Sequence, residues 1–129
     1  MKRLLLLAYW VALPAFAQTV DCEDAVTQSD MNICASLDWE EADDALNEAY
    51  RAAIRVMKQI DSTLPAAERG AEDVLRRAQR AWVPVRDATC EANGFAMKGG
   101  SAQPLVIYGC MAQLTRERTE ILWAIAESY

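Results

Sequence analysis

The four cysteines of this 129-residue chain are the first residues whose type could carry chemistry: Cys22, Cys34, Cys90 and Cys110. No two of them have the Cys-x-x-Cys spacing that is typical of zinc and redox sites. The sequence contains no histidine, which removes the commonest metal ligand and the commonest general base. We therefore expect no metal and no cofactor. An even number of cysteines in a short chain predicts a disulfide framework if the chain is exported.

A run of carboxylates is the second candidate: Glu40, Glu41, Asp43, Asp44 and Glu48. A calcium loop would need alternating acids, a glycine and a distal glutamate, and the run has none of this spacing. Two interpretations remain open. The run could be a solvated helix face, or Glu40, Glu41 and Asp44 could form an acidic patch that steers a basic partner toward the protein.

Several other polar residues lie on or beside apolar stripes: Asp43, Asn47, Gln79, Arg86 and Arg118. Asp43 and Asn47 are four residues apart, so they share one face of a helix, as do Gln79 and Arg86. These residues could form a buried polar network that sets helix register, with the arginines paired to carboxylates such as Asp43 or Asp87. They could instead line an active or ligand site. Because no nucleophile stands beside a base, we predict that the protein is not an enzyme.

Apolar residues recur at steps of three and four in three segments, which predicts helices over residues 28–60, 65–92 and from 103 or 104 to 127. The short connection 61–64 should make the first two helices antiparallel neighbours. The segment 93–102 contains three glycines and predicts a flexible loop. The expected fold is all-α, with three helices in an up-down arrangement.

The apolar stripes predict which side chains face the core. In the second helix the stripe is Leu75, Ala78, Trp82, Val85 and Thr89. In the third helix it is Ile107, Met111, Leu114, Ile121, Leu122 and Ile125. Arg118 falls on the same face as this last stripe, so we expect it to be mostly buried and paired with a carboxylate.

The positions of the cysteines favour one of the three possible pairings. Cys90 and Cys110 lie symmetrically about Gly100, so an antiparallel hairpin places them opposite one another. Cys22 then pairs with Cys34 by elimination. Twelve residues of straight helix would separate these two by about 18 Å, so the chain before the first helix must fold back along it as a disulfide-tethered strap.

The N-terminus has the pattern of a cleavable signal peptide. A basic start, Met1-Lys2-Arg3, is followed by an apolar run and a small-x-small exit, Ala15-Phe16-Ala17. The apolar run is shorter than the roughly 20 residues that a membrane span needs. We therefore expect residues 1–17 to be the leader and 18–129 a single helical domain. The mature protein should be soluble, in the periplasm or outside the cell.

The charge of the chain restricts its partners. The net charge is −6, and loss of Lys2 and Arg3 with the leader leaves 11 basic residues against 19 acidic ones, or −8. Such a charge argues against nucleic acid and against the membrane surface as partners, and it favours a basic protein. It could also simply keep the protein soluble.

The order of many residues resembles the LprI-like lysozyme-inhibitor family of small secreted bacterial proteins. The matching residues are Cys22, Thr27-Gln28, Met31-Asn32-x-Cys34, Ala42-Asp43, Leu46-Asn47, Tyr50, Gln79-x-x-Trp82, Arg86-Asp87-x-x-Cys90, Gly100-Ser101, Cys110, Leu114-Thr115-x-x-Arg118 and Leu122. The resemblance implies a binding protein that occludes lysozyme or another basic cell-wall hydrolase. The alternative is an envelope interaction or scaffold protein that does not inhibit lysozyme. The sequence does not specify the oligomeric state.

The loop 93–102 is the candidate inhibitory element under this resemblance. A lysozyme cleft holds two catalytic carboxylates, so an inhibitor could insert a cationic or hydroxyl side chain there. Lys98 and Ser101 are the candidates in this loop. The other interpretation is a plain hairpin loop that the second disulfide closes.

Overall fold

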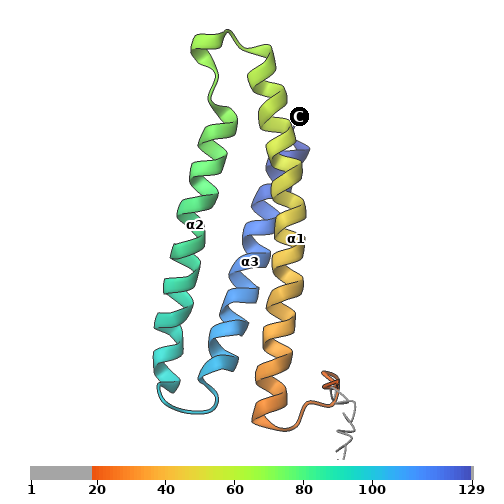
Figure 1. The fold of residues 1–129 in the computed structure, drawn as a ribbon, viewed down its shortest axis with the longest axis vertical. Helices are drawn as coiled ribbons and strands as arrows, with labels where there is room; N and C mark the ends of the chain where they lie inside the picture. Colours follow the sequence, from red (N-terminus) through yellow and green to blue (C-terminus); the bar gives the residue numbers. More distant parts are fainter. Residues whose placement is uncertain (1–18, 129) are drawn as a thin grey trace, which may run out of the picture.

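Three long helices run up, down and up again along the molecule (Figure 1). The structure is a computed structural model and describes residues 19–128. The helices are α1 (Gln28–Thr63), α2 (Ala71–Gly94) and α3 (Gln103–Glu127). Two short 3₁₀ turns, η1 (Ala66–Glu68) and η2 (Phe95–Met97), lie on either side of α2. The predicted all-α, three-helix arrangement is confirmed, whereas the expected leader lies outside the described residues.

The limits of α1 follow from local chemistry. The Thr27 side chain accepts a hydrogen bond from the Asp30 backbone N–H at 3.1 Å, as the N-cap of a helix does. The helix continues past its predicted end to Thr63. It ends there because the next residue, Leu64, precedes Pro65, and a residue before proline disfavours helical geometry.

The start of α2 is set by a carboxylate from the end of α1. The backbone N–H groups of Gly70, Ala71 and Glu72 donate to the Asp61 carboxylate at 2.8, 2.9 and 3.1 Å. Three otherwise unpaired donors of the helix end are thereby satisfied. The helix therefore begins at Ala71, and the predicted start at Pro65 was wrong because η1 and an extended residue intervene.

Replacing Asp61 with asparagine should lower the thermal midpoint of unfolding at neutral pH. The three backbone hydrogen bonds hold the pKa of the Asp61 carboxyl below its usual value of 3.8, and the bond from Gly70 has the largest effect. A carboxyl whose pKa is depressed in the folded state stabilises the fold at pH values above its unfolded pKa. This stabilisation is lost as the pH falls through the folded pKa. The difference between the two proteins should be constant above about pH 5 and shrink below 3.8. Midpoints measured from pH 7 to pH 2.5 test this, and a difference independent of pH would contradict it.

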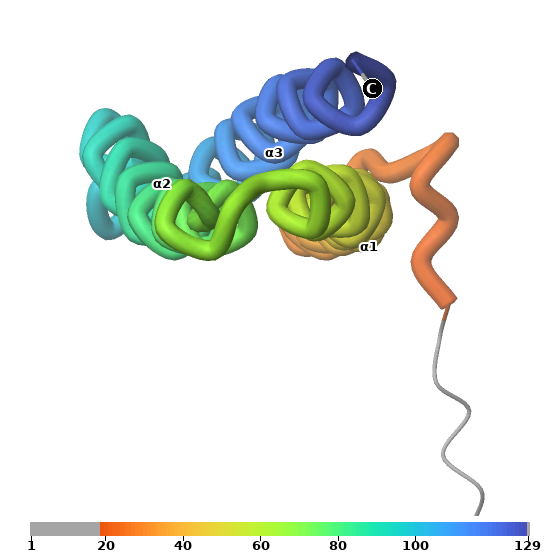
Figure 2. Tube along the Cα trace, turned by 90° about the horizontal axis from the view of Figure 1, so that it is seen from above, coloured from red at the N-terminus to blue at the C-terminus, as the bar shows by residue number. Residues whose placement is uncertain are grey.

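The helices α1 and α3 share the most extensive interface of the bundle. Small side chains permit this close packing, because Ala42, Ala49, Ala53 and Ala112 are all buried. Larger residues fill the centre of the core: Leu46, Ile54, Leu75 and Leu122. Seen from above, α3 lies over one side of the layer that α1 and α2 form (Figure 2). The opposite side of that layer has no helix over it among residues 19–128.

The inward face of α2 differs from the predicted stripe. Val85 is 63% exposed, and Ala78 and Thr89 are also exposed, so their assignment to the core was wrong. The residues that turn inward are Leu75, Gln79, Trp82, Arg86 and Cys90. Polar partners and a disulfide across the bundle satisfy this face, which hydrophobic periodicity does not detect. On α3, Ile121 is likewise exposed rather than part of the core.

The two disulfides are those predicted, Cys22–Cys34 and Cys90–Cys110. The first links the chain ahead of α1 to the second turn of that helix. This confirms that the N-terminal segment is a strap tethered by a disulfide. The second joins α2 to α3 near their connection. Both pairs have Cα atoms 5.5 Å apart, within the ordinary range for a disulfide.

The connection between α2 and α3 is more ordered than a flexible loop. Its first part continues as helix to Gly94 and then as η2. Gly99 adopts a φ of 77°, a conformation that favours glycine, and its N–H donates to the Gln103 side chain at 3.2 Å. The Asn32 side chain of α1 donates to the Ser101 carbonyl at 2.9 Å. These contacts fix the connection against the beginning of α1.

Candidate functional site

A buried arginine on α2 is the polar centre of the bundle. The side chain of Arg86 is 5% exposed, and its Nε donates to the neighbouring Asp87 at 2.9 Å. Its Nη1 reaches Asp43 on α1 at 3.3 Å and the Thr115 hydroxyl on α3 at 3.3 Å. One guanidinium group therefore makes polar contacts with all three helices, which fixes their relative register.

Two tryptophan rings lie against this guanidinium group. The Arg86 Cζ atom lies 5.6 Å from the Trp39 ring centroid and 5.1 Å from that of Trp82. Trp39 also stacks on Tyr108 of α3, with centroids 5.7 Å apart. Cation–π contacts of this kind stabilise a charge that burial would otherwise disfavour. The Trp39 indole Nε1 is buried and has no hydrogen-bond partner within residues 19–128.

Arg118 differs from the expectation. It is half-buried, and its Nε donates to the Gln79 side-chain oxygen at 3.0 Å. Within residues 19–128 it forms no ion pair, so the expected carboxylate partner was wrong. Burial lowers the pKa of Arg118, and its charge is supported by the Trp82 ring, whose centroid is 5.9 Å from Cζ.

A groove of about 410 Å³ runs between α1 and α2 beside this centre. Its lining residues are Trp39, Asp43, Leu46, Asn47, Tyr50, Gln79, Arg80, Val83 and Arg86. Four of the five polar residues singled out in the sequence thus come together in one place, and Arg118 adjoins them through Gln79. We call this feature the α1–α2 groove.

Sequence reasoning missed the aromatic and cationic walls of the α1–α2 groove. Trp39 precedes Asp43 by four residues, and Arg80 directly follows Gln79. The helical spacing 39, 43, 47 and 50 was the signal that could have placed Trp39 and Tyr50 on the polar face.

The acidic candidates lie elsewhere. Glu40, Glu41 and Asp44 are exposed and do not line the α1–α2 groove. Glu41 lies on the α3 side of α1, where it shares a shallow pocket with Arg116. Arg116 itself binds Asp38 at 2.5 Å and, by this hydrogen bond, lowers the pKa of that carboxyl. The acidic run is therefore divided between different sides of α1.

The loop candidates lie at the end of the molecule where α2 and α3 connect. Lys98 is exposed, and its Nζ atom lies 4.7 Å from the Phe95 ring centroid. Ser101 is exposed as well, while its carbonyl accepts the bond from Asn32. Phe95 and Met97 are 56% and 47% exposed, so this tip presents apolar surface around one cation. The structure does not bring the tip together with the α1–α2 groove.

The described residues contain neither a metal cluster nor a membrane span. Among residues 19–128, no group of three or more cysteine or acidic side chains could hold a metal ion. In the same range, no helix is both long enough and apolar enough to cross a bilayer. The fold and its polar centre define a small, disulfide-linked helical bundle.

The chain belongs to the LprI family, whose model is described as "Lysozyme inhibitor LprI" and matches residues 21–122. An uncharacterized protein of Rhizobium meliloti is 46% identical over 120 residues, which cover 89% of this chain and 86% of that protein. The crystal structure of a DUF1311 family protein from Pseudomonas putida is similar with a TM-score of 0.68 at 26% identity. That match covers 80% of this chain and 97% of the other. Membership in a family of inhibitors implies a non-catalytic protein.

Proposed function

We propose that this protein is an exported inhibitor that binds lysozyme, or another basic cell-wall hydrolase, and occludes its cleft. The observation that carries the proposal is the match to the lysozyme-inhibitor family over nearly the whole helical domain. The proposal includes cleavage after Ala17 and residence in the periplasm or outside the cell. The two disulfides support it, because disulfides persist in oxidising compartments.

The charge of α1 supports a basic partner. Between residues 28 and 50 the helix contains seven acidic residues and no lysine or arginine. Two of them, Asp38 and Asp43, are paired with arginines, whereas Glu40, Glu41 and Asp44 are exposed. Exposed charges of one sign attract an oppositely charged protein and raise its association rate.

The loop at the α2–α3 end supports insertion into a cleft. Lys98 and Ser101 are exposed at a tip that the Cys90–Cys110 disulfide and the Asn32 contact hold in place. A tip that is ordered before binding loses less conformational entropy in the complex. The Lys98 cation would meet the catalytic carboxylates of a lysozyme cleft.

Binding kinetics on immobilised lysozyme at low and high salt test the two surfaces separately. Neutralising Glu40, Glu41 and Asp44 together should slow association several-fold and weaken its dependence on salt. Replacing Lys98 with alanine should instead speed dissociation about tenfold or more, because contacts inside a cleft determine residence time. In a turbidity assay on cell walls, both sets of variants should inhibit lysozyme less than the unchanged protein does.

Two outcomes would count against this proposal in different ways. No binding at micromolar protein would exclude lysozyme inhibition and favour the envelope scaffold. Tight binding that neither set of substitutions changes would keep the inhibitor function but contradict both surfaces. Because all four residues are exposed, the variants should fold, and circular dichroism checks this.

A further inference from the structure

We propose that the α1–α2 groove is a binding site for a small ligand that carries a carboxylate next to an aromatic or aliphatic group. The groove is distinct from the Lys98 tip and from the exposed acids, so this activity goes beyond lysozyme inhibition. Its volume of about 410 Å³ lies within the range of sites that hold small molecules. Four features of the groove indicate this class of ligand.

The first feature is the balance of hydrogen-bond donors and acceptors in the groove. The Asp43 carboxylate is already engaged, since Oδ1 accepts from Arg86 and Oδ2 accepts from Asn47 at 3.1 Å. The Gln79 oxygen accepts from Arg118, which leaves the amide NH₂ of Gln79 to donate. The groove therefore offers the Gln79 amide as a donor, while both oxygens of its one carboxylate and the Gln79 oxygen already accept hydrogen bonds. Such a groove favours a ligand with acceptor oxygens.

The second feature is the cation at the edge of the groove. Arg80 is exposed, lines the groove and forms no ion pair within residues 19–128. A planar guanidinium group binds a carboxylate through two parallel hydrogen bonds. Arg80 is thus the residue that can anchor the acid group of a ligand.

The third feature is the local charge of the groove. Three arginines, Arg80, Arg86 and Arg118, lie in or against the groove, whereas the carboxylates there are those of Asp43 and Asp87. The groove is therefore locally positive in a chain whose net charge is −6. Charge complementarity selects an anionic ligand at this place, although the protein as a whole attracts cations.

The fourth feature is the apolar part of the groove wall. Trp39, Leu46, Tyr50 and Val83 provide ring faces and aliphatic carbons along the groove. An aromatic or aliphatic group can pack on this wall while its carboxylate reaches Arg80. A wall that combines apolar carbons with positioned polar groups orients small ligands.

The test uses two probes that differ only in the carboxylate. N-acetyl-L-phenylalanine carries the acid beside an aromatic ring, and N-acetyl-L-phenylalaninamide replaces the acid with a neutral amide. Titration of the full mature protein, followed by tryptophan fluorescence and by amide chemical shifts, should give a dissociation constant for the acid of about 1 mM. The amide should bind about tenfold more weakly, because the charge-assisted contact is absent. The shifts should be centred on Trp39, Asn47 and Gln79.

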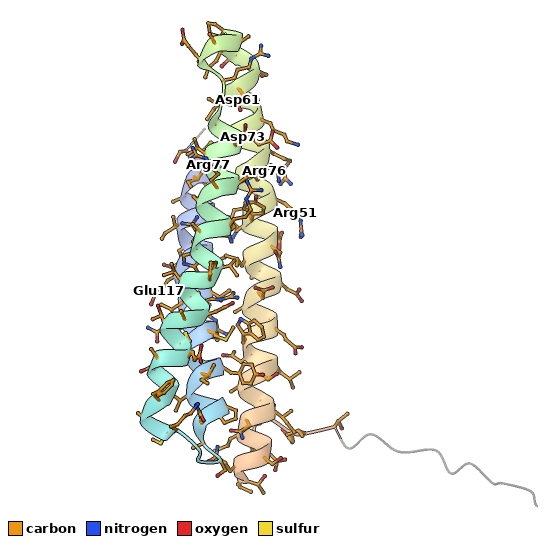
Figure 3. All side chains as sticks on the ribbon, turned by 60° about the vertical axis from the view of Figure 1, so that its left-hand side comes forward. Arg51, Asp61, Asp73, Arg76, Arg77 and Glu117 are labelled. Carbon is orange, nitrogen blue, oxygen red and sulfur yellow. A yellow bond between two sulfur atoms is a disulfide. The ribbon has the colours of Figure 1, made fainter. Side chains whose placement is uncertain are left out.

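A matched pair of variants locates the anchor. Arg80→Gln should weaken binding of the acid about tenfold and leave binding of the amide unchanged. Arg77→Gln removes the same charge from the same helix, at an exposed residue that does not line the groove, and should change neither. Figure 3 shows Arg77 on the side of α2 that is turned away from α1. Equal thermal midpoints would confirm that both variants are folded.

Three results would overturn the proposal. They are equal affinity for acid and amide, equal loss of affinity in both variants, and absence of chemical-shift changes at the groove up to about 20 mM probe. None of these results depends on lysozyme binding. The Lys98 variant is the converse control, since it should bind the acid with unchanged affinity.

Discussion

Replacing Arg86 with alanine is expected to lower the free energy of unfolding by about 3 kcal/mol. The substitution removes a guanidinium that joins Asp43, Asp87 and Thr115 and leaves the Thr115 side chain, which is fully buried, without this partner. It also opens a cavity beside two tryptophan rings. Asp43 and Asp87 are 40% and 49% exposed, so water can hydrate them, which keeps the loss at the lower end for a broken buried pair. Urea denaturation measures the effect.

Two further substitutions separate charge from packing. Arg86→Met keeps an unbranched stem against the rings of Trp39 and Trp82 but removes the charge and its hydrogen-bond donors, so it should cost less than the alanine variant, which also leaves a cavity. Arg118→Ala should cost about 1 kcal/mol, because its polar contact within residues 19–128 is the bond to Gln79. Equal losses for Arg86→Ala and Arg118→Ala would contradict the expectation that Arg86 contributes more to the polar centre than Arg118 does.

Removal of the Cys90–Cys110 disulfide, by serine at both positions, should lower the free energy of unfolding by about 3 kcal/mol. The bridge closes a loop over a sequence separation of 20 residues and ties α2 to α3. Cys90 is fully buried, so a serine hydroxyl there would also need a partner that the core does not provide. For a domain of this size the loss is a large part of the total stability.

The other disulfide provides the matched control. Serine at both Cys22 and Cys34 releases a strap whose residue 22 is exposed, and the helices keep their mutual contacts. We therefore expect a smaller decrease in the midpoint of urea unfolding for this variant. A larger decrease than for the Cys90–Cys110 variant would contradict this order and show that the strap, not the α2–α3 bridge, limits stability.

The sequence by itself determined the helices, their up-down order and both disulfides. Helical periodicity is a local property of the chain, and the symmetric spacing of Cys90 and Cys110 about Gly100 needs only the geometry of a hairpin. The family followed from the order of many residues and agrees with the match over residues 21–122. The polar residues of the groove could also be chosen, since Asp43, Asn47, Gln79 and Arg86 have helical spacing.

Only the tertiary structure decided which way α2 faces and which partner each arginine takes. Its apolar stripe pointed toward Val85, but rotation of the helix instead buries Arg86, whose contacts with α1 and α3 satisfy the buried charge. Arg86 engages Asp43 and Asp87, and Arg118 is left to Gln79. The start of α2 likewise depends on Asp61, a residue of the preceding helix. These contacts join different segments of the chain, so the pattern within any one helix cannot specify them.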